Sequence, residues 1–282
     1  MNTPNIIIIP DVHGRKFWKD AIDMFPKDTY PDMQIVFLGD YLDPYTGYED
    51  ITKEDAFTNF LEIIEYAKRD NRITLLIGNH DWHYFVYLDT CRIDYAREHQ
   101  IEQIFKENIS MFRLHKVIEL NGTKYLFTHA GITQKWLDDI AYMATQQHNE
   151  WNPGDPSSPN YVDPKDDDRY QWICKIANIN KTYDIGLLEK CLEKYDESFY
   201  SCIPSMVSRE RGGWYPHGSI IWADVHEHIH DNHIDGYYQI FGHTMPYPNN
   251  DQYAYEINLK WAMIDASQAF VIDSSNYLKP LK

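Results

Sequence analysis

Five short polar clusters contain side chains that commonly bind metal ions, and each cluster follows an apolar run. In chain order they are Asp11-Val12-His13, Gly39-Asp40, Gly78-Asn79-His80-Asp81, His129 and Gly242-His243. Carboxylate, amide and imidazole ligands without cysteine suit divalent cations of intermediate hardness, such as Mn²⁺, Fe or Zn²⁺. Because strands of an open α/β sheet place their carboxyl ends at one edge, we expect the five clusters to converge there.

The spacing of these residues predicts how two ions would be held. Asp11 and His13 are two residues apart at a strand end, where both can bind one ion, and Asp40 can bridge two ions with its two oxygens. The other ligands of the second ion would be Asn79, His129 and His243. Two cations roughly 3.5–4 Å apart can clamp a phosphate and lower the pKa of a bridging water, which becomes the nucleophile. The predicted chemistry is therefore phosphoester hydrolysis.

His80 directly follows Asn79 and cannot easily bind the same ion. It is better placed to protonate the leaving alkoxide as a general acid. Asp43, three residues after Asp40, is the candidate that holds the tautomer of His80 and supports its charge. A purely structural site needs no acid, so this pair favours an enzyme over a non-catalytic, metal-stabilised binding protein.

Each cluster alone has a simpler explanation. Gly-Asp at a strand end is usually a turn, and Asn-His-Asp after a strand can cap the next helix. The metal-site interpretation depends on all five clusters occurring in order, each after a strand-like run.

The apolar pattern predicts the elements that position these residues. Asn5–Pro10, Gln34–Leu38 and Arg72–Ile77 are apolar runs typical of strands buried on both faces. Lys16–Phe25 and Thr52–Asp70 have helical spacing, and Thr52 with Asp55 forms a possible capping box. This alternation predicts right-handed crossovers and a largely parallel sheet.

Later segments predict a hairpin and a further set of elements. Asn121-Gly122 is a favoured two-residue turn, and it separates strand-like His115–Leu120 from Thr123–Thr128. The remaining predicted helices are Gln100–Asn108, Thr133–Gln147 and Gly186–Tyr195, and the remaining predicted strands are Gly236–Phe241, Trp261–Asp265 and Ala269–Asp273.

We expect a single domain over residues 1–282, because ligands from Asp11 to His243 must meet in space. Four prolines and an acidic run in Trp151–Tyr170 predict a loop or insertion. The surrounding region, about 150–235, is the candidate for a substrate-specific cap.

The net charge, the cysteine spacing and the apolar stretches indicate which partners and which cellular compartment to expect. The net charge of -17 disfavours binding to duplex nucleic acid, although bound metal ions would reverse the local field. The four cysteines form no CxxC pair, and no stretch has the length of a membrane span. We therefore expect reduced thiols and a soluble, cytoplasmic protein that does not bind membranes.

The ordered strings PDVHG, GDYLD, GNHD, THAG and GHT resemble the calcineurin-like metallophosphoesterase superfamily. They are most similar to its phosphoprotein phosphatase branch, which includes Ser/Thr protein phosphatases and symmetrical diadenosine-tetraphosphate hydrolases. The resemblance implies an α/β sandwich of two mixed sheets flanked by helices, with a dimetal site at the carboxyl ends of the strands. It implies the same roles as above for the metal ligands, for His80 and for Asp43.

The sequence also departs from this family. The branch usually reads GDxxDRG, in which the arginine binds the substrate phosphate, whereas Pro44-Tyr45 follows Asp43 here. The candidate replacements are Arg15, Arg209 and Arg211. The superfamily's second terminal histidine is Met245 here, and Pro10 replaces the glycine of the usual GDxHG. A segment with His226, His228, His230 and His233 is a rival metal feature, although a solvated histidine-rich turn is its simpler interpretation.

These observations predict a metal-dependent phosphoesterase that attacks phosphorus with a metal-bridging hydroxide. The leading substrate is a phosphomonoester, either a phosphoprotein or a small phosphorylated metabolite. The alternative substrates are a phosphodiester or a dinucleoside polyphosphate.

Overall fold

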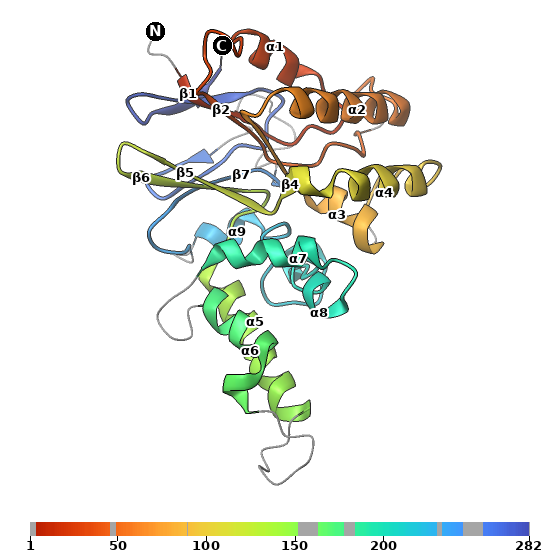
Figure 1. Cartoon of the computed structure of the whole chain (residues 1–282), viewed down its shortest axis with the longest axis vertical. Coiled ribbons are helices and arrows are strands. Elements are labelled where there is room, and N and C mark those ends of the chain that lie inside the picture. Colours follow the sequence, from red (N-terminus) through yellow and green to blue (C-terminus); the bar gives the residue numbers. More distant parts are fainter. Residues whose placement is uncertain are drawn as a thin grey trace.

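The computed structural model describes residues 4–45, 49–88, 90–151, 163–177, 184–229, 233–244 and 256–281. Two sheets lie face to face, and most helices lie outside them (Figure 1). The predicted α/β sandwich of two mixed sheets flanked by helices is confirmed.

The first sheet has the strand order β11-β10-β1-β2-β3-β4. Its strands are β1 (Pro4–Ile9), β2 (Gln34–Phe37), β3 (Ile73–Leu76), β4 (Phe112–Arg113), β10 (Phe270–Asp273) and β11 (Leu278–Pro280). The neighbours from β1 to β4 pair in parallel, as the β-α-β-α-β pattern predicts, whereas β10 and β11 add antiparallel edge pairs.

The second sheet has the order β5-β6-β7-β9-β8. Its strands are β5 (His115–Leu120), β6 (Thr123–Thr128), β7 (Tyr238–Phe241), β8 (Glu256–Ile257) and β9 (Trp261–Met263). The predicted hairpin joins β5 to β6, and Asn121 and Gly122 both have positive φ, at 49° and 80°. Two positive φ values are what a type I′ hairpin turn requires.

The continuous apolar run of β1 is explained by burial on both faces. Ile7 and Ile9 belong to the cluster beneath the outer helices, which includes Trp18 and Phe60. Ile6 and Ile8 belong to the cluster that contains Phe127 and fills the space between the two sheets. Alternate residues of one strand therefore fill two cores, and no polar position remains in Ile6–Ile9.

The helices surround the sheets on several sides. α1 (Phe17–Asp23), α2 (Lys53–Arg69), α3 (Asn79–Val86) and α4 (Glu98–Glu107) follow the first strands. α5 (Gln134–Trp151) packs against α6 (Asp168–Ile176), and both extend away from the sheets with α7 (Glu189–Glu193) and α8 (Ser198–Ser201) nearby (Figure 1). α9 (Val225–Ile229) precedes β7. No helix in the described ranges is both long enough and apolar enough to cross a membrane.

Two boundary predictions need correction. The end of the predicted loop Trp151–Tyr170 is helical, because Asp167 caps α6 by accepting hydrogen bonds from the amides of Arg169 and Tyr170; residues 152–162 lie outside the described ranges. The predicted helix Gly186–Tyr195 is a 3₁₀ turn over Ile185–Leu188 that continues into the short α7.

The capping box of α2 yields a stability prediction. Thr52 Oγ1 accepts a hydrogen bond from the Asp55 amide at 3.1 Å, and Asp55 accepts one from the Thr52 amide at 3.0 Å. Thr52→Ala should lower the free energy of unfolding by about 1 kcal/mol in urea titrations, because an N-terminal helix donor loses its partner. The matched change Thr58→Ala, at an exposed position inside the same helix, should be neutral or slightly stabilising. Equal effects of the two changes would contradict the capping role.

Candidate functional site

The five predicted clusters meet at one end of the sandwich. Asp11 follows β1, Asp40 follows β2 and Asn79 begins α3 just after β3, all in the first sheet. His129 and His243 follow β6 and β7, which are parallel neighbours in the second sheet. Both sheets therefore supply side chains to one site, as expected for the carboxyl ends of parallel strands.

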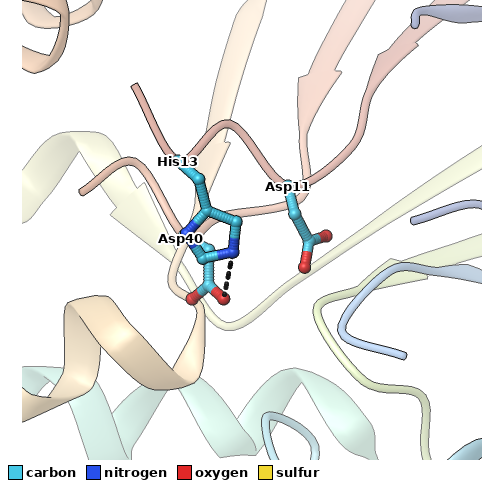
Figure 2. Close-up of side chains that lie close together, drawn as sticks. All are labelled: Asp11, His13 and Asp40. Atoms are coloured by element: carbon cyan, nitrogen blue, oxygen red, sulfur yellow. Dashed lines mark ion pairs between the residues drawn. The ribbon is translucent and has the colours of Figure 1, made fainter. Parts of the chain in front are cut away.

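One half of the site contains Asp11, His13 and Asp40 (Figure 2). One ligand atom from each lies within 4.8 Å of the others, and all three residues are buried. His13 Nδ1 lies 2.9 Å from the carbonyl oxygen of Leu42 and donates to it, so His13 Nε2 carries a lone pair. That nitrogen lies 3.5 Å from Asp40 Oδ2.

The other half contains Asn79, His129 and His243. Asn79 Oδ1 lies 2.9 Å from both His129 Nε2 and His243 Nδ1, and these two nitrogens are 3.1 Å apart. His129 Nδ1 donates to the carbonyl oxygen of Leu38 at 2.8 Å, so its Nε2 also carries a lone pair. Asp40 Oδ2 lies 3.6 Å from His129 Nε2, which places this carboxylate between the two halves.

The electrostatics of this arrangement suit bound cations. Burial, and then the charges of Asp265 and Asp40, raise the pKa of Asp11 well above its ordinary value. Burial also lowers the pKa values of His13, His129 and His243, which keeps the imidazoles neutral, as metal ligands must be. Crowded lone pairs and carboxylates repel one another unless a cation lies between them. The residues therefore fit divalent metal ions in both halves of the site.

His80 and Asp43 form a pair beside the metal-ligand residues. His80 Nδ1 lies 2.8 Å from Asp43 Oδ2, and the Tyr84 hydroxyl donates to Asp43 Oδ1 at 2.8 Å. Burial lowers the pKa of His80, but the charge of Asp40 and the hydrogen bond to Asp43 outweigh burial and raise it to about 10. The predicted pairing of these two residues is thus present in the structure.

A cavity of about 450 Å³ opens onto this site. Of the predicted phosphate-binding arginines, Arg211 lines it, whereas Arg15 and Arg209 do not. Arg15 is buried, and it donates from Nε to Glu49 Oε1 at 2.8 Å and from Nη1 to the carbonyl oxygen of Asp11 at 3.3 Å. Arg209 is exposed on a 3₁₀ turn.

A fourth arginine, Arg92, also lines the cavity. It lies between α3 and α4, in a segment whose local sequence has no helical or strand pattern to indicate its position. The only available signal is an arginine shortly after GNHD in a chain that lacks the arginine after Asp43.

The histidine-rich segment does not form a second metal cluster among the described residues. His228 is buried, its Nε2 donates to the carbonyl oxygen of Ala130 at 3.1 Å, and its ring stacks on Phe241. Burial lowers the pKa of His228 to about 4. His226 instead pairs with Asp224 at 2.6 Å. His230 and Met245 lie outside the described residues.

Asp81, the last residue of GNHD, supports the site from behind. It is fully buried, and its two oxygens accept hydrogen bonds from the amides of Asp40 at 2.7 Å, Tyr41 at 3.0 Å and Gly78 at 2.9 Å. One side chain thereby fixes the backbone at the ends of both β2 and β3.

The fold and this site define a class of protein. A family model described as calcineurin-like phosphoesterase matches residues 4–262, so the chain belongs to the calcineurin-like phosphoesterase family. The assignment of the motif strings to this family is confirmed.

Among curated proteins, the serine/threonine-protein phosphatase 6 catalytic subunit of Caenorhabditis elegans is 24% identical over 200 residues. This match, which agrees with the phosphoprotein phosphatase branch, covers 68% of the chain and 56% of that relative. The chain thus spans little more than half the length of this relative.

Two solved structures are also similar. A serine/threonine phosphatase from Saccharomyces cerevisiae, with similarity to human phosphatase PP5, matches at 12% identity and a TM-score of 0.41, over 99% of this chain and 81% of that one. The phosphoesterase Yfce from E. coli matches at 13% identity and a TM-score of 0.27, over 44% and 57%.

The contacts of Asp81 predict a large effect of its removal. Asp81→Ala should lower the free energy of unfolding by roughly 3 kcal/mol or more in urea titrations, because buried amide donors lose their partner. The near-isosteric variant Asp81→Asn keeps one acceptor oxygen, so its free energy of unfolding should fall clearly less than that of Asp81→Ala. If Asp81→Ala unfolds at the wild-type urea concentration, the side chain does not support these strand ends.

Proposed function

We propose that this phosphoesterase is a dimetal phosphomonoesterase, which acts on a phosphoprotein or a small phosphorylated metabolite. The observation that carries the proposal is the position of Asp40, between two groups of lone-pair ligands and beside the His80–Asp43 pair. A site that only binds metal has no use for such a pair.

The proposed ligands are Asp11, His13 and Asp40 for one ion and Asp40, Asn79, His129 and His243 for the other. Mn²⁺, Fe and Zn²⁺ all suit these nitrogen and oxygen donors. When bound, the ions would polarise the phosphate oxygens and generate the nucleophile from water.

Side chains of the protein would then protonate the leaving group. Asp43 holds Nδ1–H of His80, so that Nε2–H is the proton available to the departing alkoxide. Tyr84 donates to the other oxygen of Asp43 and fixes the orientation of the carboxylate. The hydrogen bond to Asp43 favours the imidazolium form of His80, which is the form that a general acid requires.

We also propose one domain with a substrate-specific cap at about 150–235. Arg211 and Trp222 come from this region and line the cavity above the metal ligands. A substrate that reaches Asp40 through this cavity would meet both side chains. The cap, rather than the metal ligands, would then decide which phosphoester is accepted.

The function is tested by hydrolysis of para-nitrophenyl phosphate and its bis ester, with added Mn²⁺ or with EDTA. We expect Mn²⁺-dependent release from the monoester, abolished by EDTA and by Asp40→Asn, which removes the bridging charge. Preference for the bis ester would instead support a phosphodiesterase or dinucleoside polyphosphate hydrolase. No turnover despite bound metal would favour a non-catalytic binding protein.

The acid role predicts a separate result. His80→Ala should lower kcat for the monoester by roughly 10²–10⁴-fold and leave the metal content unchanged, because general acid catalysis is lost and no ligand is removed. His99→Ala, at a histidine whose side chain is 88% exposed, is the matched control and should behave as wild type. A His80→Ala variant with wild-type kcat would exclude His80 as the acid, and metal loss would place it among the ligands.

A further inference from the structure

Arg92 brings a guanidinium group to Tyr45, close to where related phosphatases carry their phosphate-binding arginine. Pro44-Tyr45 stands in place of that arginine and the residue after it. The Cζ atom of Arg92 lies 3.7 Å from the centroid of the Tyr45 ring, and both residues line the cavity over the site. Stacking on an aromatic face holds an arginine while leaving its edge free for hydrogen bonds.

The guanidinium nitrogens of Arg92 have different neighbours: Nε contacts the backbone of Asp43, and Nη2 contacts the side chain of His80. Its Nε donates to the carbonyl oxygen of Asp43 at 3.0 Å, which ties it to the residue that orients His80. Its Nη2 lies 3.2 Å from His80 Nε2, and because a guanidinium nitrogen can only donate, Nε2 accepts in this contact. An anion oxygen bound here would accept from Arg92 Nη2 instead, and His80 Nε2 could then carry the proton for the leaving group.

Arg92 also differs from the other arginines near the site in whether a carboxylate neutralises its charge. Arg15 forms an ion pair with Glu49, and Arg211 forms one with Asp224, each at 2.8 Å. No carboxylate within the described ranges forms an ion pair with Arg92. Its positive charge is therefore available to an anionic substrate.

The backbone of Arg92 is held in an unfavourable conformation. Its φ is 67°, in the left-handed region, which is unfavourable for a residue other than glycine. The next residue, Ile93, is 1% exposed in the core, and its carbonyl oxygen accepts a hydrogen bond from Lys53 at 2.6 Å. The surrounding packing thus imposes the conformation that directs Arg92 toward the site.

We propose that Arg92 binds the phosphate group of the substrate in place of the arginine missing after Asp43. This inference rests on the proposed phosphomonoesterase function and assigns its substrate a terminal, doubly charged phosphate. Arg92 supplies an unbalanced positive charge and Arg211 a second guanidinium in the same cavity. Two guanidinium groups favour a phosphomonoester dianion over a singly charged diester.

The test measures binding of inorganic phosphate to the Mn²⁺-loaded protein by calorimetry, beside kinetics with para-nitrophenyl phosphate. Arg92→Ala should weaken phosphate binding about tenfold or more and raise KM by a similar factor, because a charge-assisted contact is lost. Arg92→Lys keeps the positive charge but loses the planar guanidinium group. Its phosphate affinity and KM should lie between those of Arg92→Ala and wild type. The control is Arg69→Ala, at an arginine on α2 whose side chain is 79% exposed. Its phosphate affinity and KM should equal those of the wild type.

Two results would overturn the assignment. One is unchanged phosphate affinity in both Arg92 variants that retain wild-type metal content and melting temperature. The other is an equal loss in Arg69→Ala, which would indicate a general charge effect. If the wild-type protein hydrolyses no phosphoester, the proposed function fails, but the phosphate affinities still decide the role of Arg92.

Discussion

The rest of the site depends on the crowding of electron-pair donors at one end of the sandwich. Asn79 Oδ1, His129 Nε2 and His243 Nδ1 lie within 3.1 Å of one another, and Asp40 reaches toward this group and toward His13. Burial raises the pKa of a further carboxyl group here, that of Asp265, to about 6. Such a cluster is costly in an apolar interior without compensating positive charge. Divalent cations provide that charge most directly, and the same cations would make the site reactive toward phosphate.

Much of the local backbone is explained by the need to bring these donors together. Four site residues have positive φ values, from 44° to 67°: His13, Asp40, Asp43 and His243. This backbone conformation is uncommon for residues other than glycine. Glycines precede three of the ligands, Asp40, Asn79 and His243, because there is no space for a side chain. A Cβ on Gly78 would lie 2.1 Å from Asp40 Oδ1, and one on Gly242 would lie 1.9 Å from Asp11 Oδ1. The core strands and Asp81 stabilise a set of turns that would be unfavourable alone.

Sequence patterns predicted the framework of the site well, for a physical reason. The ligands follow strands that are buried on both faces, so the apolar runs locate the strand ends and the polar residues after them are conspicuous. The Asn121-Gly122 hairpin and the Thr52 capping box were also predictable, because each depends on local backbone chemistry. Arg92 was not predictable: its segment has no periodicity, and its side chain reaches the cavity only because tertiary packing holds Ile93 and Tyr45 in place. The helical start at Asp168 is not evident from the sequence because proline and aspartate are typical of loops, whereas here Asp167 caps a helix.

We propose that Asp40 lies between two bound cations, and a crystal structure of the protein with Mn²⁺ would show whether it does. Anomalous difference maps from data collected on both sides of the manganese absorption edge would locate the ions independently of any assay. We predict two peaks that share Asp40, one beside Asp11 and His13 and the other beside Asn79, His129 and His243. A single peak, or peaks that leave Asp40 without a metal contact, would contradict a two-ion site bridged by Asp40.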